Sequence, residues 1–284
     1  MSVITRINGL EESVQEIVAG SGDLSSFPVF AEDYARQILL SIEGMTTSEF
    51  NELDLERLVR DAFQDSTIIL SQDLEDDILN RIDTTLEKTV SFYADFIDDM
   101  TDTTLRSAIE GHHAYQALTK HLKNDFAAMN KKLFDGTISA ITEQFQAGEL
   151  NRAKLQEAIL AKTDTFAAHA KTNAHMAVSS HNRLGRKAVK DSAGLQHGYY
   201  YGQRRGNTRA FCSHMIGRVL HTDQIQQLSN GQGLDVEVHC GGYRCIHSWM
   251  WVELSWDQEI ADLYEKELEI IDLRADSLNL SVPA

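Results

Sequence analysis

The chain of 284 residues contains only two prolines, Pro28 and Pro283. A proline inside a helix removes a backbone hydrogen bond and clashes with the preceding turn, so the stretch between them can form long uninterrupted helices. A hydrophobic content of 42% is sufficient for a buried core, and the length permits two domains. The scarcity of proline therefore favours a mostly helical protein.

The chain also lacks any run of about eighteen apolar residues, the length that a helix needs to span a membrane. Its first residues, MSVITRINGLEESVQEI, have neither the basic start nor the apolar stretch of a signal peptide. We therefore expect a protein that is made and folds in the cytoplasm and has no membrane partner.

Cysteine is scarce and clustered, since the three cysteines of the chain, Cys212, Cys240 and Cys245, all lie within 34 residues. An odd number of cysteines cannot form a closed disulfide framework. Histidines lie among these cysteines in the sequence, so metal ligation is the better interpretation of the cluster.

Charge is distributed unevenly along the chain, whose net charge is −17. Residues 1–110 carry 7 basic and 24 acidic side chains, residues 111–252 carry 17 and 10, and residues 253–284 carry 2 and 9. An acidic first third is repelled by nucleic acid, whereas the basic middle segment tolerates or contacts phosphate. A solvated helical exterior explains the acidic part equally simply.

Hydrophobic periodicity predicts long helices before residue 194. Apolar residues recur every three or four positions over 55–62, 74–100, 115–133 and 151–193. Thr46 and Glu49 have the spacing of a capping box, Gly136 is expected to break the third helix, and Asn151 and Gly194 suit the two ends of the fourth. We thus expect an acidic helical region at 1–110 and a second helical region at 111–190.

The pattern changes at residues 186–195, where we place a domain boundary. The aromatic stretch HGYYYG and the segments RVLH, DVEVH and WMWVEL are typical of short strands, with glycine turns between them. From Ser255, a candidate N-cap, one more acidic amphipathic helix is expected. The predicted class is α+β, mostly α, with a small α+β domain at 191–252 and a terminal helix at 253–284.

The cysteine-rich segment offers a metal site. Tetrahedral zinc needs four thiolate or imidazole ligands, and Cys212, Cys240, Cys245 and His247 supply them in closely spaced pairs. The spare candidates are His214, His221 and His239. Alternatively, the cysteines are small buried hydrophobic residues. Structural zinc is favoured over catalytic zinc because the segment offers only Asp223, Asp235 and Glu237 as carboxylates.

Other chemistry has less support. A cysteine with a histidine two residues further on rarely places thiol and imidazole in hydrogen-bond reach, and no third orienting group is evident. The motifs GxSxG, HExxH, GxGxxG and the P-loop are absent from the sequence. Arg204, Arg205 and Arg209, beside the tyrosine run, can contact nucleic-acid phosphate. Alternatively, Arg209 and Arg218 anchor carboxylates or carbonyls within the small domain.

The stretch YYYGQRRGNTRAFCSHMIGRVLHTDQIQQLSNGQGLDVEVHCGGYRCIHSW resembles the C-terminal domain of the phage Mu F-like head morphogenesis proteins, which are minor capsid proteins of tailed phages. The resemblance covers about a quarter of the chain. It rests on Thr208, Arg209, Phe211, Cys212, Gly217, Asn230, Gly231, Gln232, Gly241, Gly242, Tyr243, Cys245, His247 and Trp249. The chain departs from the family pattern at Cys240 and at Ile246, where a second arginine is common.

The resemblance implies a virion structural protein rather than an enzyme. Family members act at the portal vertex during head assembly, so the expected partners are portal or connector proteins and the major capsid protein, with many copies arranged around a ring. Phage DNA is a further expected partner, during packaging or ejection. Two alternatives stay open: a zinc-dependent nuclease or hydrolase that uses His239 or His247, and a DNA-binding accessory protein.

Overall fold

The computed structural model describes residues 2–24, 27–43, 45, 49, 54–146 and 151–264. It is mostly helical with one small antiparallel sheet, which confirms the predicted α+β, mostly α class. Within these residues, no helix is both long enough and apolar enough to cross a membrane.

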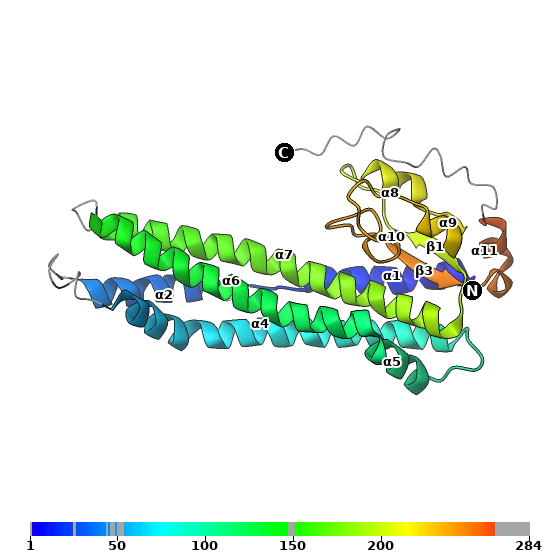
Figure 1. Ribbon diagram of the computed structural model, residues 1–284, viewed down its shortest axis with the longest axis horizontal. Helices are drawn as coiled ribbons and strands as arrows, with labels where there is room; N and C mark the ends of the chain where they lie inside the picture. Colours follow the sequence, from blue (N-terminus) through cyan, green and yellow to red (C-terminus); the bar gives the residue numbers. More distant parts are fainter. Residues whose placement is uncertain are drawn as a thin grey trace. The chain divides into compact units, whose positions relative to one another are not determined.

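Long helices precede the sheet and short elements surround it (Figure 1). The helices before the sheet are α1 (Val3–Gly20), α2 (Phe27–Ile42), α4 (Leu55–Ala94), α5 (Asp102–Gly111), α6 (His113–Gln146) and α7 (Arg152–Ala193). The later elements are β1 (His197–Tyr201), α8 (Ala210–Met215), β2 (Val219–His221), α9 (Thr222–Gln226), α10 (Val236–His239), β3 (Ser248–Val252), the 3-10 helix η1 (Leu254–Trp256) and α11 (Gln258–Asp262).

The described residues form two compact units. Unit 1 contains the residues up to Ala19, Arg81–Thr119 and the residues from Met176 onward, and unit 2 contains Gly20–Asn80 and Lys120–His175. Helices α4, α6 and α7 each contribute to both units. The units therefore divide the chain differently from the four consecutive segments expected, because each long helix passes from one unit into the other.

The long helices are more continuous than the sequence pattern predicts. The segments expected at 55–62 and 74–100 belong to the single helix α4, which ends at Ala94, and Thr46 of the expected capping box lies outside the described residues. Gly136 does not end α6, because the helix continues to Gln146. A Cβ at Gly136 would make ordinary van der Waals contact with the Lys162 side chain at 3.4 Å, so the surroundings do not require glycine here.

Both expected ends of α7 are confirmed. The Asn151 side-chain oxygen accepts a hydrogen bond from the Lys154 N–H at 3.1 Å, as an N-cap does. Gly194 follows the last turn with φ +70°, and the Leu195 N–H bonds the Lys190 carbonyl at 3.1 Å. A left-handed glycine with this bond is a common way for a helix to end.

The core of unit 2 is formed by apolar side chains of its helices. The rings of Phe27 and Phe166 stack at 5.7 Å, and the fully buried Tyr34 donates its hydroxyl hydrogen to Thr137 at 3.1 Å. Burial raises the pKa of Tyr34 to about 12, so the hydroxyl stays a neutral donor. The described part of unit 2 is thus stabilised by ordinary helix packing that includes a buried hydrogen bond between two hydroxyls.

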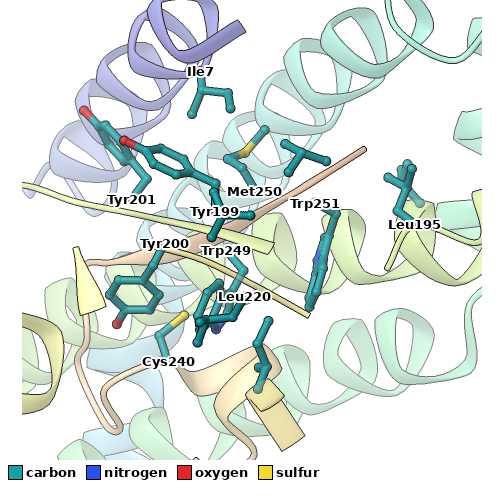
Figure 2. Close-up of a cluster of buried hydrophobic side chains, with 14 of the residues drawn as sticks. Ile7, Leu195, Tyr199, Tyr200, Tyr201, Leu220, Cys240, Trp249, Met250 and Trp251 are labelled. Carbon is teal, nitrogen blue, oxygen red and sulfur yellow. The ribbon is translucent and has the colours of Figure 1, made fainter. Parts of the chain in front are cut away.

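The sheet of unit 1 has the strand order β2-β1-β3, with both neighbours antiparallel to β1. Tyr199 pairs with Met250, and Tyr200 pairs with Trp249. Because side chains alternate along a strand, Tyr199 and Met250 point to the face on which Ile7 of α1 lies, whereas Tyr200 and Trp249 point to the opposite face (Figure 2). Every residue of β3 is buried, so both faces of this strand are covered.

Two predicted elements near the sheet are wrong. The segment DVEVH forms the short helix α10 instead of a strand, because the Asp235 side chain caps the Glu237 N–H at 2.9 Å and starts a helical turn. After β3, Asp257 rather than Ser255 is the N-cap of α11, and its carboxylate also accepts the Val3 N–H at 2.8 Å. The remainder of the expected terminal helix, 265–284, lies outside the described residues.

Candidate metal centre

Cys212, Cys245 and His247 converge on one point of unit 1. Cys212 lies on α8, and the other two lie in the segment that leads from α10 into β3. Their ligand atoms all lie within 4.8 Å of one another, and all three residues are buried. The Cys212 and Cys245 sulfurs are 3.5 Å apart, and the Cys245 sulfur is 3.4 Å from Nδ1 of His247. The three side chains are thus close enough to hold a metal ion.

Two of the three separations match those of ligands around one tetrahedral ion. With zinc–sulfur bonds of about 2.3 Å and a zinc–nitrogen bond of about 2.0 Å, two sulfurs lie about 3.8 Å apart and sulfur and nitrogen about 3.5 Å. The observed 3.5 and 3.4 Å are within a few tenths of an ångström of these values. The donor set of two thiols and one imidazole also suits zinc better than magnesium or calcium, which prefer oxygen.

The His247 ring is oriented by a second hydrogen bond. Its Nε2 lies 3.3 Å from the carbonyl oxygen of Gln203, which can only accept a hydrogen. With the ring proton on Nε2, the Nδ1 atom presents a lone pair toward Cys245. A carbonyl that fixes the tautomer in this way is the usual outer partner of a metal-binding histidine.

Two glycines allow the backbone to approach the cluster. A Cβ at Gly241 would lie only 2.1 Å from the Cys212 sulfur, and a Cβ at Gly202 would lie 2.0 Å from the His247 ring. The Gly241 N–H also donates to the Cys245 sulfur at 3.3 Å. A backbone N–H directed at a sulfur stabilises its thiolate form, which is the form that binds metal.

The Tyr200 side chain of β1 closes the cluster from the sheet side. Its hydroxyl oxygen is 3.4 Å from the Cys212 sulfur and 3.8 Å from the Cys245 sulfur, and its ring stacks on His247 at 5.8 Å. Burial, together with the neighbouring cysteines, raises the pKa of Tyr200 well above its usual value. The hydroxyl therefore stays protonated and remains a donor to the Cys212 sulfur.

The two sulfurs share their protons unequally. The hydrogen bond from the Cys212 thiol lowers the pKa of Cys245 far below its usual value, and the nearby Arg183 guanidinium acts in the same direction. The same hydrogen bond, with burial, raises the pKa of Cys212. Of the two thiols, Cys245 thus loses its proton readily and Cys212 keeps its proton. A bound cation would replace that second proton.

Cys240, the fourth predicted ligand, does not belong to this group. It follows α10 with φ +51°, and its side chain lies beside Tyr200, Trp249 and Leu220 in the core (Figure 2). Burial raises its pKa to about 12, so it behaves as a buried thiol. The grouped ligand atoms of the described chain therefore come from three residues and not from the predicted four, although Cys240 lies near enough for its charge to act on Cys212 and Cys245.

The spare histidines have other positions. His221 caps α9 by accepting the Asp223 N–H at 3.2 Å, and its ring packs against His197 at 5.3 Å. His239 lies on α10, where burial and the Arg183 charge lower its pKa. His214 is exposed on α8. None of the three is among the grouped ligand atoms of the described chain.

Arg209 makes the contacts of an internal anchor. Its guanidinium donates to the carbonyl oxygens of Gly241 at 3.0 Å and Tyr243 at 2.6 Å, and so holds the ligand loop to the start of α8. Arg204 and Arg205 are exposed, and Arg204 donates to the Ser213 carbonyl at 2.8 Å. Contact of these three arginines with nucleic acid stays a prediction.

A small pocket opens onto the cluster. It has a volume of about 290 Å³, and its floor includes Cys212, Cys245 and His247. The remaining lining residues are Arg205, Asn207, Thr208, Arg209, Arg244 and Ile246. No carboxylate is among these residues, so the pocket as described offers guanidinium, hydroxyl and amide groups beside the two thiols and the imidazole.

Sequence reasoning missed the buried basic residues that support the site. Arg183 of α7 donates to the Cys245 carbonyl, and Arg186 pairs with Glu11 of α1. Lys190 bonds Glu237 at 2.9 Å and lies 4.5 Å from the Trp251 ring. The spacing of three and four residues between Arg183, Arg186 and Lys190 places them on one helix face, which is turned to the core.

The chain was compared with protein-family models, with curated proteins and with solved structures, and none of them matches it.

Proposed function

We propose that this protein is a structural minor capsid protein of a tailed phage, which binds the portal or the head–tail connector during head assembly and genome packaging or ejection. The proposal combines the resemblance of residues 199–249 to the Mu F-like proteins with the use that the fold makes of the same residues. On this proposal the chain works in the virion, in several copies around a ring, and performs no catalysis.

The observation that carries the proposal is that the shared motif residues hold the loop around the ligands in place. The Asn230 side-chain amide donates to the carbonyls of Leu234 at 2.9 Å and Cys240 at 3.1 Å. The Gln232 side-chain oxygen accepts the Tyr243 N–H at 2.7 Å. Together with the Arg209 bonds, these contacts fix the loop that carries the ligands. Such use of motif residues is expected of a rigid binding module rather than of a reactive site.

We further propose that Cys212, Cys245 and His247 hold a structural zinc ion. Zinc would neutralise the charge of the two thiolates. It would also link α8 to the loop before β3 by bonds that are stronger than hydrogen bonds. The support for this is the donor set, the oriented Nδ1 of His247 and the close approach of Gly241. Cys240 is not included in the proposed ligand set.

A second candidate is a zinc-dependent nuclease, and the arginine-lined pocket favours it. Against it, no carboxylate lines the pocket in the described chain, whereas a metal-dependent hydrolase normally positions one to take up a proton from water. Incubation of the zinc-loaded protein with single- and double-stranded DNA distinguishes the two. Cleavage that chelation abolishes would favour the nuclease.

The test of the proposed function is association with the portal. The purified full chain is mixed with the portal ring encoded by the same phage genome and separated by size-exclusion chromatography. We expect co-elution with several copies per ring, and detection of the chain by mass spectrometry in purified particles. Failure to co-elute, together with absence from particles, would contradict the proposal.

A further inference from the structure

The pocket above the cluster has a consequence for the coordination of the metal. Among the described residues, three ligand atoms meet at the cluster, whereas zinc in proteins is almost always four-coordinate. The Tyr200 ring stacks on His247 from the sheet side of the cluster, and the same three ligands line the pocket. A fourth ligand can therefore reach the ion from the pocket.

The charge of the pocket restricts what that ligand is. An ion of charge +2 held by two thiolates and a neutral imidazole is formally neutral, while Arg205, Arg209 and Arg244 add three positive charges around it. No acidic residue lines the described pocket. An anion is thus favoured over a neutral molecule or a cation.

The volume of the pocket and the types of side chain that line it favour an oxyanion. A volume of about 290 Å³ is at the lower limit for ligand pockets, which suits a group the size of phosphate better than a large cofactor. Arginine guanidinium groups match the oxygens of phosphate in pairs, and the Thr208 hydroxyl, whose oxygen accepts the Arg205 N–H at 2.7 Å, can donate a further hydrogen bond.

We propose that the pocket binds a phosphate group, free or at the end of a nucleic acid strand, that completes the coordination of the metal held by Cys212, Cys245 and His247. The proposal rests on the zinc site proposed above and deepens it. Arg205 is the residue that we assign to contact the anion from the rim, because Arg209 already donates to two backbone carbonyls.

The experiment uses cobalt(II), whose visible absorption reports the number and type of its ligands. The full chain is loaded with cobalt(II), desalted and titrated with inorganic phosphate at constant ionic strength maintained with chloride. We expect a sulfur-to-cobalt charge-transfer band before the titration and a saturable change in the d–d bands during it. In parallel, a 5′-phosphorylated oligonucleotide is compared with the unphosphorylated one, to separate free phosphate from a strand end.

Adjacent arginines provide a matched pair of variants. Arg205→Ala is expected to weaken phosphate binding about tenfold, the loss of one charge-assisted hydrogen bond. Arg204→Ala removes an equally exposed arginine that does not line the pocket, and should bind phosphate like the unchanged protein. Both variants should retain the charge-transfer band, which shows that the metal site is intact.

Three outcomes would overturn the inference. If the charge-transfer band is present but the d–d bands do not change when phosphate is added, phosphate does not occupy the fourth coordination position. This result refutes the anion site but not the metal site. Equal weakening by both substitutions refutes a specific contact with Arg205. Absence of the charge-transfer band refutes the metal site and the anion site together. Portal association, measured separately by co-elution, is unaffected by any of these results.

Discussion

Helix α7 carries basic residues in both units, and these side chains are exposed to solvent in unit 2 but mostly buried in unit 1. In unit 2, Arg152, Lys154, Lys162 and Lys171 are exposed. In unit 1, Arg183, Arg186 and Lys190 are each less than 7% exposed. The same residue types on the same helix thus cover a surface in one unit and support a core in the other.

The difference shows why charge counted along a sequence does not define a binding surface. The segment 111–252 carries an excess of basic residues, which suggested contact with nucleic acid. Several of those charges are instead paired inside unit 1 with Glu11 and Glu237 or bound to a backbone carbonyl. Fewer basic side chains are therefore available to bind phosphate than the net charge suggests. Those that line the pocket near the cluster are among them.

The largest effect is expected from Arg186→Met, which breaks the ion pair at the centre of unit 1. Glu11 would keep a buried carboxylate without its cation, so we expect a loss of about 3–5 kcal/mol of unfolding free energy, measured by urea denaturation. Lys154→Met, at an exposed position of α7 in unit 2, should change stability by less than about 0.5 kcal/mol.

A double variant separates charge from packing at this position. Glu11→Leu combined with Arg186→Met removes both charges, and should recover most of the stability lost in the single variant. If the double variant is as unstable as the single one, the loss arises from packing and not from an unpaired buried charge.

An intermediate effect is expected from Cys245→Ser, compared with Cys240→Ala. Loss of a ligand should reduce bound zinc from about one ion per chain to near zero, measured by elemental analysis. At free zinc 100 times the Kd of the unchanged protein, the lost stabilisation is about 2.7 kcal/mol. Cys240→Ala should keep its zinc, because Cys240 lies outside the ligand group. Full zinc content in Cys245→Ser would exclude Cys245 as a ligand.

The smallest effect is expected from Glu237→Gln, and it depends on pH. Burial alone would raise the pKa of Glu237, but hydrogen bonds from Lys187 and Lys190 outweigh burial and lower it. The pairing therefore stabilises the fold above about pH 4.3, the value in the unfolded chain, and is lost as the pH falls through the lowered folded pKa.

At pH 7 we expect Glu237→Gln to cost about 1 kcal/mol, and the difference from the unchanged protein to shrink toward pH 3, measured by urea denaturation at both values. Glu157→Gln, at an exposed position of α7 in unit 2, serves as the control and should show no difference at either pH. A constant difference at all pH values would mean that the charge of Glu237 contributes nothing.

The fold was largely predictable because its signals are local. The ends of α7 follow from Asn151 and Gly194, and two of the three expected segments after β1 are strands. The errors also have local causes, since the cap at Asp235 outweighs the alternation of DVEVH. The division into units was not predictable, because it depends on which parts of α4, α6 and α7 pack together.

The candidate site was predictable in part. Spacing alone identified Cys212, Cys245 and His247, but it also included Cys240, which is not among the grouped ligand atoms of the described chain. Tyr200 and Gln203 were not assigned to the site, because their role depends on where β1 lies relative to the loop before β3. A tyrosine in a strand far from the cysteines in sequence carries no signal of such a contact.

The position of the three tryptophans gives the protein a built-in optical reporter. Trp249, Trp251 and Trp256 all lie in unit 1. Trp249 packs against Tyr200 at 4.6 Å and stands two residues after the ligand His247. Indole emission therefore follows unit 1 alone, whereas far-ultraviolet circular dichroism follows the helices of both units. Melting curves that coincide for the two signals would mean that the units unfold together, and curves that separate would assign each transition to its unit.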